Sequence, residues 1–110
     1  MSFRIVPTNR FKKDVLELSK NYPHIWSDLK ELNRILNENE RAGASLGSNI
    51  YKIRLRCTDI SKGKRSGYRV ISYVKDEEQV VRLLTIYAKT KIGDVRKEEI
   101  LQILKAEGII

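Results

Sequence analysis

The chain has 110 residues, a length that suits one domain spanning residues 1–110. Its side chains are 41% hydrophobic and 33% charged, a globular composition rather than a disordered one, and its formal net charge is +8. Neither a membrane-spanning apolar run nor a signal peptide is recognisable, and the single cysteine, Cys57, excludes an internal disulfide. We therefore expect a cytoplasmic protein with no membrane partner.

The first forty residues predict a strand and then a helical hairpin. Residues 3–6 form a short apolar run that ends at Pro7, and Thr8 or Asn9 can cap the following helix. The break at residues 21–23 is short, so two antiparallel helices are expected, the second starting at Pro23, with Trp26 widening its core stripe. The apolar positions that recur at helical spacing are Phe11, Val15 and Leu18, then Ile25, Leu29, Leu32 and Leu36.

The remaining chain predicts three strands and a last helix. Residues 37–49 are polar and indicate a loop, whereas 51–57 alternate between apolar and basic side chains, as in a half-buried strand. Residues 67–74 and 80–87 predict two further strands, and Asp94 can cap a helix that carries Ile100, Ile103 and Leu104. The expected fold is α+β in the order βααβββα. Two N-terminal helices pack on a small, largely antiparallel four-stranded sheet, and a C-terminal helix follows.

Positive charge is concentrated between residues 52 and 75. This segment holds eight lysines and arginines against one acid, Asp59, and Lys52, Arg54 and Arg56 share one face of the predicted strand. Such a cluster repels itself unless an anion neighbours it, so nucleic acid, an acidic protein or a membrane surface are candidate partners. A basic surface that only keeps the protein soluble is the alternative.

Familiar catalytic motifs are missing from the sequence. It contains no metal-ligand spacing and no nucleophile elbow, and residues 63–67 lack the Gly-Lys-Ser/Thr ending of a phosphate loop. His24 has no evident partner and is interpreted as structural or solvated. No metal or cofactor is therefore expected. An enzyme limited to cations and phenols suits RNA cleavage, because the ribose 2′-hydroxyl is itself the nucleophile.

Three segments in the right order resemble the RelE/ParE toxin superfamily, and most of all its RelE/HigB-type members from type II toxin–antitoxin modules. They are YKIRLR at 51–56, GYRVI at 67–71 and LTIYAK at 84–89, and the terminal EEILQIL at 98–104 also fits. The resemblance covers nearly the whole chain. It implies two N-terminal helices on a small, largely antiparallel sheet, cleavage of messenger RNA on the ribosome by 2′-hydroxyl attack to leave a cyclic phosphate, and neutralisation by a co-expressed antitoxin.

The resemblance also assigns roles residue by residue. Lys52 and Arg54 stand where the family has a base and transition-state contacts, and Arg69 stands where an arginine contacts the scissile phosphate. Some members have an arginine after the last strand, where this chain has Lys89, so Lys89 or Tyr87 is the candidate proton donor. The tyrosine that some members have near the start of the last helix is also absent, and Arg96 lies near that place.

Lys52 keeps two possible roles. The like charges of Arg54 and Arg56 favour its neutral form and a role as base, whereas a bound phosphate favours the charged form and a simple contact. The residues expected to bind RNA around this centre are Arg56, Lys62, Lys64, Arg65 and Lys91.

Two other functions remain open at this stage, because one fold can carry several activities. A ParE-like toxin would inhibit DNA gyrase without cutting RNA, and a nucleic-acid-binding module would have no activity. The expected partners of an RNA-cleaving toxin are the ribosome, messenger RNA and an acidic antitoxin segment that folds on binding. The apolar stripes of the first two helices offer that segment a groove.

Overall fold

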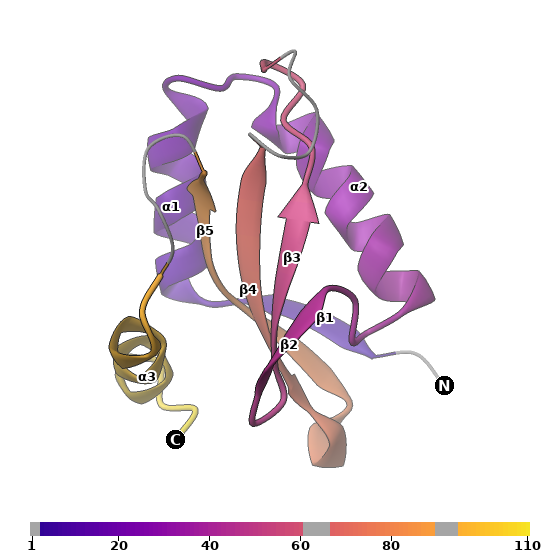
Figure 1. Ribbon diagram of the computed structural model, residues 1–110, viewed down its shortest axis with the longest axis vertical. Coiled ribbons are helices and arrows are strands. Elements are labelled where there is room, and N and C mark those ends of the chain that lie inside the picture. Colours follow the sequence, from indigo (N-terminus) through magenta and orange to yellow (C-terminus); the bar gives the residue numbers. More distant parts are fainter. Residues whose placement is uncertain (1–2, 61–66, 90–94) are drawn as a thin grey trace.

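The computed structural model describes residues 3–60, 67–89 and 95–110. Over these residues the chain forms three α-helices around one five-stranded sheet with the strand order β1-β5-β4-β3-β2 (Figure 1). A 3-10 turn at Asp76–Glu78 joins β4 to β5. The elements in chain order are β1 (Arg4–Pro7), α1 (Asn9–Ser19), α2 (Ile25–Glu38), β2 (Ala44–Gly47), β3 (Ile50–Leu55), β4 (Tyr68–Lys75), β5 (Val80–Ala88) and α3 (Lys97–Ala106).

The α+β class and the helical hairpin were predicted correctly, but the four-stranded sheet was wrong. The segment expected to be a loop contains β2, which pairs antiparallel with β3 and has only exposed residues. A fully exposed four-residue strand has no buried face, so it leaves no alternating pattern in the sequence. β1 pairs parallel with β5 and the other strand pairs are antiparallel, so the sheet is mixed and largely antiparallel.

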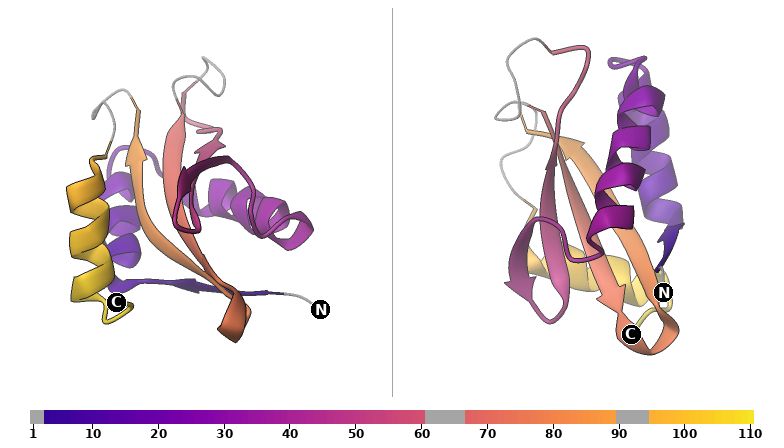
Figure 2. Two further views of the ribbon diagram at one scale, coloured as in Figure 1. Left: turned by 60° about the horizontal axis from the view of Figure 1, so that its bottom comes forward. Right: turned by 90° about the vertical axis from the view of Figure 1, so that its right-hand side faces the viewer.

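The two helices of the hairpin cover one face of the sheet, as the right-hand view of Figure 2 shows. Thr8 caps α1: its hydroxyl oxygen accepts from the Phe11 N–H at 3.1 Å, and its O–H donates to the Leu83 carbonyl at 2.8 Å. One cap therefore fixes both the start of the helix and its position on β5. The main core lies between this hairpin and the sheet, and includes Phe11, Val15, Ile25, Leu32, Leu36, Ile53, Leu55, Val70 and Ile86.

The third helix packs against the opposite face of the sheet, beside β5 (Figure 2). Its expected apolar stripe, Ile100, Ile103 and Leu104, is buried against Leu84 and Tyr87 in a second, smaller core. The far end of α3 is tied to the hairpin as well. The two carboxylate oxygens of Glu107 accept from the backbone N–H groups of Asn9 and Arg10, each at 3.1 Å. These two N–H groups have no partner within α1, so Glu107 caps that helix from a distance.

Several boundaries and one core assignment differ from the sequence-based expectations. The second helix begins at Ile25 rather than at Pro23, and Arg96 precedes the last helix as its cap residue. Asp94, the expected cap, lies outside the described residues. Trp26 is 54% exposed, so its expected place in the core is wrong. Ile25 occupies the inward position instead, and its neighbour Trp26 turns outward.

Candidate functional site

Strands β3, β4 and β5 place the predicted catalytic residues on one face of the sheet. Ile53 and Leu55 on β3 belong to the main core, so alternation directs Lys52 and Arg54 to the opposite face. The same alternation directs Arg69 on β4 to that face, and Tyr87 on β5 lies there within the second core. The set therefore shares the sheet face on which α3 packs.

The strand register brings three of these residues into one row. Arg54 is the direct partner of Arg69, and Arg69 is the direct partner of Tyr87. Lys52 lies opposite Ile71, one step along the same face. Directly opposed residues have Cβ atoms about 5 Å apart, so the two guanidinium-bearing side chains start side by side near one end of β3 and β4.

Arg69 is buried, although a residue that contacts a bound phosphate is expected to be accessible. Only 4% of it is exposed, and its Nη1 donates to the Tyr68 backbone carbonyl at 3.2 Å. Arg54, by contrast, is exposed. The difference arises because α3 and its core occupy part of the same face. Protein groups accept hydrogen bonds from the Arg69 guanidinium in this structure. A phosphate that binds Arg69 must therefore replace these protein acceptors.

The two candidates for the proton donor differ in accessibility. Tyr87 is 5% exposed and packs in the second core with Leu84 and Ile100. Lys89 is half-buried, and its backbone N–H donates to the Gly67 carbonyl at 3.0 Å, which extends the β4–β5 pairing by one residue. Of the two, only the Lys89 side chain is open enough to reach a substrate without unpacking the core.

The predicted RNA-binding residues divide into one that is described and four that are not. Arg56 follows β3 directly and is exposed, whereas Lys52 within the strand is half-buried. Lys62, Lys64, Arg65 and Lys91 lie outside the described residues.

A close backbone approach fixes how β3 and β4 meet at the basic end of the sheet. A Cβ atom placed on Gly67 would lie 2.3 Å from the Leu55 carbonyl oxygen and 3.3 Å from the Arg56 Cα. No side chain fits there, so glycine allows the end of β3, which bears Arg54, and the start of β4, which bears Arg69, to lie in contact.

Sequence reasoning missed a polar cluster at the start of α2. His24 was expected to have no partner, but its Nδ1 lies 2.7 Å from Asp59 Oδ1, and its backbone N–H donates to Asp59 Oδ2 at 3.0 Å. Asp59 raises the pKa of His24, and His24 lowers the pKa of Asp59. Asp28, which is buried, accepts from both the backbone N–H and the hydroxyl of Thr58. The partners are 35 and 30 residues apart, so no local pattern could have revealed them.

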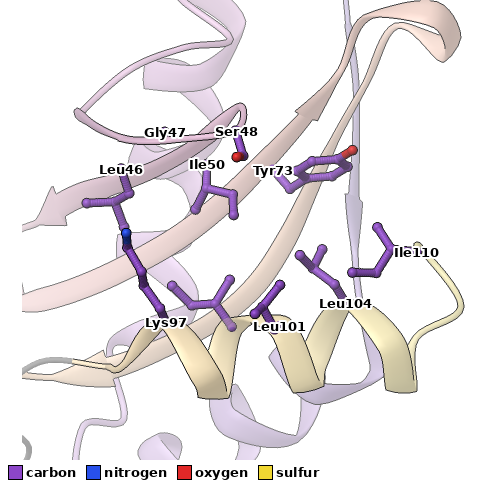
Figure 3. A pocket seen from close by; sticks show the side chains of 10 residues that line it. Leu46, Gly47, Ser48, Ile50, Tyr73, Lys97, Leu101, Leu104 and Ile110 are labelled. Atoms are coloured by element: carbon purple, nitrogen blue, oxygen red, sulfur yellow. The ribbon is translucent and has the colours of Figure 1, made fainter.

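A cavity of about 410 Å³ opens between α3 and the β2–β3 hairpin (Figure 3). The paired residues Ile50 and Tyr73 line one wall, and Leu101 and Leu104 line the other. Among the described residues that line it, Lys97 is the charged one. A mainly apolar cavity does not suit a phosphodiester. We therefore place the candidate site at the paired residues Arg54 and Arg69, called the cationic row below, and not in this cavity.

Across 3–60, 67–89 and 95–110, no group of three or more His, Cys, Asp or Glu side chains is placed to hold a metal ion. Over the same residues, no helix has the length and apolar character needed to cross a membrane.

Comparison with known proteins identifies the fold. No protein-family model matches the sequence. The isolated E. coli RelE toxin has 23% sequence identity, a TM-score of 0.59, and a match over 96% of this chain and 98% of that one. A complex of an E. coli RelE mutant with an antitoxin RelBc peptide has 23% identity, a TM-score of 0.54 and 93% coverage of both chains. An archaeal RelE–RelB complex from Pyrococcus horikoshii OT3 has 17% identity, a TM-score of 0.52, and coverage of 84% and 100%.

The chain therefore has the fold of the RelE toxins over nearly its whole length, which confirms the fold that the sequence resemblance implied.

Proposed function

We propose that this protein is the toxin of a type II toxin–antitoxin module and that it cleaves messenger RNA on the ribosome without a metal ion. The observation that carries the proposal is the cross-strand pair Arg54 and Arg69 on a RelE-type fold. Two adjacent guanidinium groups match the negative charge that a phosphodiester gains in its transition state.

The proposed reaction uses the 2′-hydroxyl of the RNA as nucleophile. Lys52, in its neutral form, accepts the 2′-hydroxyl proton, and the oxygen attacks the adjacent phosphorus. Arg54 and Arg69 stabilise the charge on the phosphoryl oxygens. The bond from phosphorus to the 5′-oxygen breaks, and Lys89 in its charged form protonates that oxygen. The products are a 2′,3′-cyclic phosphate and a 5′-hydroxyl end. We assign the donor role to Lys89 because Tyr87 is packed in the second core.

An acidic antitoxin is the proposed protein partner. Two of the structures with this fold are complexes of RelE with a RelB antitoxin or its peptide. In this chain, the helical hairpin carries an apolar groove of about 280 Å³ between α1 and α2. Leu16 at 59% and Trp26 at 54% are exposed along it, and Lys12 lies at its edge. These features suit an amphipathic segment with apolar anchors and acidic flanks.

Induced expression in bacteria tests the cleavage. Primer extension on cellular transcripts should show new 5′ ends soon after induction of the wild type and none after induction of Arg69→Ala. Filamentation with DNA damage and intact transcripts would instead favour the ParE-like inhibition of gyrase. If the cells continue to grow while the induced wild-type protein is folded and soluble, a nucleic-acid-binding module without activity would be favoured.

The groove is tested separately by co-purification with the protein encoded beside this chain. Leu16→Asp and Trp26→Asp should weaken that complex and leave cleavage intact, because both residues are exposed on the helical hairpin, which covers the sheet face opposite the cationic row of Arg54 and Arg69. A complex of unchanged affinity would exclude the groove as the docking surface.

A further inference from the structure

Residues at the N-terminal end of α2 form hydrogen bonds with the segment that follows β3. Asp28 Oδ2 accepts from the Thr58 backbone N–H at 3.0 Å, and Asp28 Oδ1 accepts from the Thr58 hydroxyl. One residue further on, Asp59 accepts from the His24 backbone N–H and pairs with the His24 ring. Two consecutive residues after the strand are thus bound by two residues of one helix turn.

The chain is held at this point from the other side as well. Cys57, next to Thr58, is buried in the main core, and the Leu55 and Arg56 backbone lies against Gly67. The segment between Arg54 and Thr58 therefore has little freedom to shift. Its basic side chains, Arg54 and Arg56, are both exposed and belong to the cationic face.

The position of Asp28 is unfavourable for a charged side chain that has no hydrogen-bond partners. It is a buried carboxylate, and burial of a charge is unfavourable without hydrogen-bond donors. Thr58 supplies two donors, and the first turn of α2 adds the positive end of a helix dipole. The contacts that satisfy Asp28 are the same contacts that fix the chain four residues after Arg54.

We infer that Asp28 and Thr58 are positioning residues that hold Arg54 and Arg56 where a phosphodiester chain can contact both. The inference rests on the proposed function, since it concerns the same cationic face. Neither residue touches the substrate; they act through the backbone of β3. A displacement of about 1 Å in such a site can cost a hundredfold in rate.

The primary variant is Thr58→Val, which keeps the side-chain shape and removes the hydroxyl donor. Thr58→Ser restores the donor and serves as the rescue. Asp76→Asn is the control for stability, because Asp76 pairs with Arg41 at 2.5 Å, far from the basic end of the sheet, and links loops rather than the cationic strands. All proteins are compared at a temperature at which circular dichroism shows them fully folded.

The binding readout uses a single-stranded DNA oligonucleotide, which lacks the 2′-hydroxyl and so cannot be cut. For Thr58→Val, we expect its affinity to fall three- to tenfold. We also expect the slope of log affinity against log salt to become shallower by about 0.7, the change for one lost phosphate contact. Thr58→Ser and Asp76→Asn should keep the wild-type slope. A loss of stability alone does not alter this slope.

The cleavage readout separates this inference from the proposed function. If the wild type cleaves RNA, Thr58→Val should lower the single-turnover rate about tenfold. A wild type that binds the oligonucleotide but cuts no RNA would contradict the proposed function, and the salt slopes would still test the positioning role. Wild-type slopes and rates in Thr58→Val, or no binding by the folded wild type, would overturn the inference.

Discussion

Arg54 and Arg69 lie directly opposite each other on β3 and β4, with like charges at the basic end of the sheet. Such a pair is unfavourable for folding, because opposed like charges repel. An RNA-binding protein gains from it, because the repulsion is relieved when a phosphate arrives between the two guanidinium groups. The cost to stability and the benefit to binding come from one arrangement, and each can be measured.

Arg54→Gln should make the free protein more stable and the proposed enzyme less active. Removal of one of the two opposed charges should raise the free energy of unfolding by about 0.2–1 kcal/mol at low ionic strength. The gain should shrink at high salt, because salt screens the repulsion at the exposed Arg54 side chain. Thermal unfolding at low and high salt measures both effects. Lower stability of Arg54→Gln at low salt would show that Arg54 makes a net favourable contribution to the fold.

The sequence predicted which face of the sheet these side chains share better than it predicted how exposed each of them is. Alternation along residues 51–57 placed Lys52 and Arg54 on the face away from the main core, and the structure agrees. The burial of Arg69 was not predictable, because it depends on the register of β4 between two other strands and on α3 packing against that face. Pairwise register and the docking of a distant helix are not encoded in any local pattern.

Two other misses have the same physical origin. The strand β2 has no buried face, so its residues look like loop residues. Trp26 extends an apolar stripe in sequence, but the sheet covers only part of the width of that stripe, and Trp26 falls outside it.

Gly67→Ala should destabilise the fold. The new Cβ would lie 2.3 Å from the Leu55 carbonyl oxygen, and backbone atoms cannot move aside as flexible side chains do. We expect a loss of about 1–3 kcal/mol, the range for overpacked sites, measured by urea denaturation. Gly47→Ala is the matched control. Gly47 has φ +89° but open space around it, so its replacement reports backbone strain without a clash. Wild-type stability of Gly67→Ala would contradict the close approach of the Leu55 carbonyl oxygen to this position.

The His24–Asp59 pair should make stability depend on pH. Because the pKa of His24 is raised above its ordinary 6.5, the contribution of charged His24 is fully present below pH 6.5 and is lost as the pH rises through the raised value. Because the pKa of Asp59 is lowered below 3.8, its contribution is present above pH 3.8 and is lost as the pH falls through the lowered value. The pair therefore contributes most between these limits.

Denaturation of His24→Gln and the wild type at several pH values measures this contribution. The wild type should exceed the variant by more at pH 5 than at pH 8. Asp59→Asn should reduce the same pH dependence, since it removes the other partner. A difference that stays constant from pH 5 to pH 8 would contradict the assigned pairing.

Glu107→Ala should loosen the link between α3 and the hairpin. It leaves the N–H groups of Asn9 and Arg10 without their carboxylate acceptors, which resembles the loss of a helix cap. The expected cost is about 0.5–2 kcal/mol by chemical denaturation. Glu98→Ala is a suitable control, because Glu98 is an exposed acidic residue in the first turn of the same helix. Equal stability of Glu107→Ala and the wild type would show that the second core alone holds α3.

Arg69 offers the most direct test of the account, in a purified translation system that contains ribosomes stalled on a defined messenger RNA. The wild type should cut the RNA to a 2′,3′-cyclic phosphate, and Arg69→Ala should do so about 10²–10³ times more slowly. Arg34→Ala, which changes an arginine paired with Glu31 on the far helical face, should cut at the wild-type rate. Equal rates for Arg69→Ala and the wild type, with both proteins folded, would contradict the assignment of the phosphodiester to the Arg54–Arg69 pair.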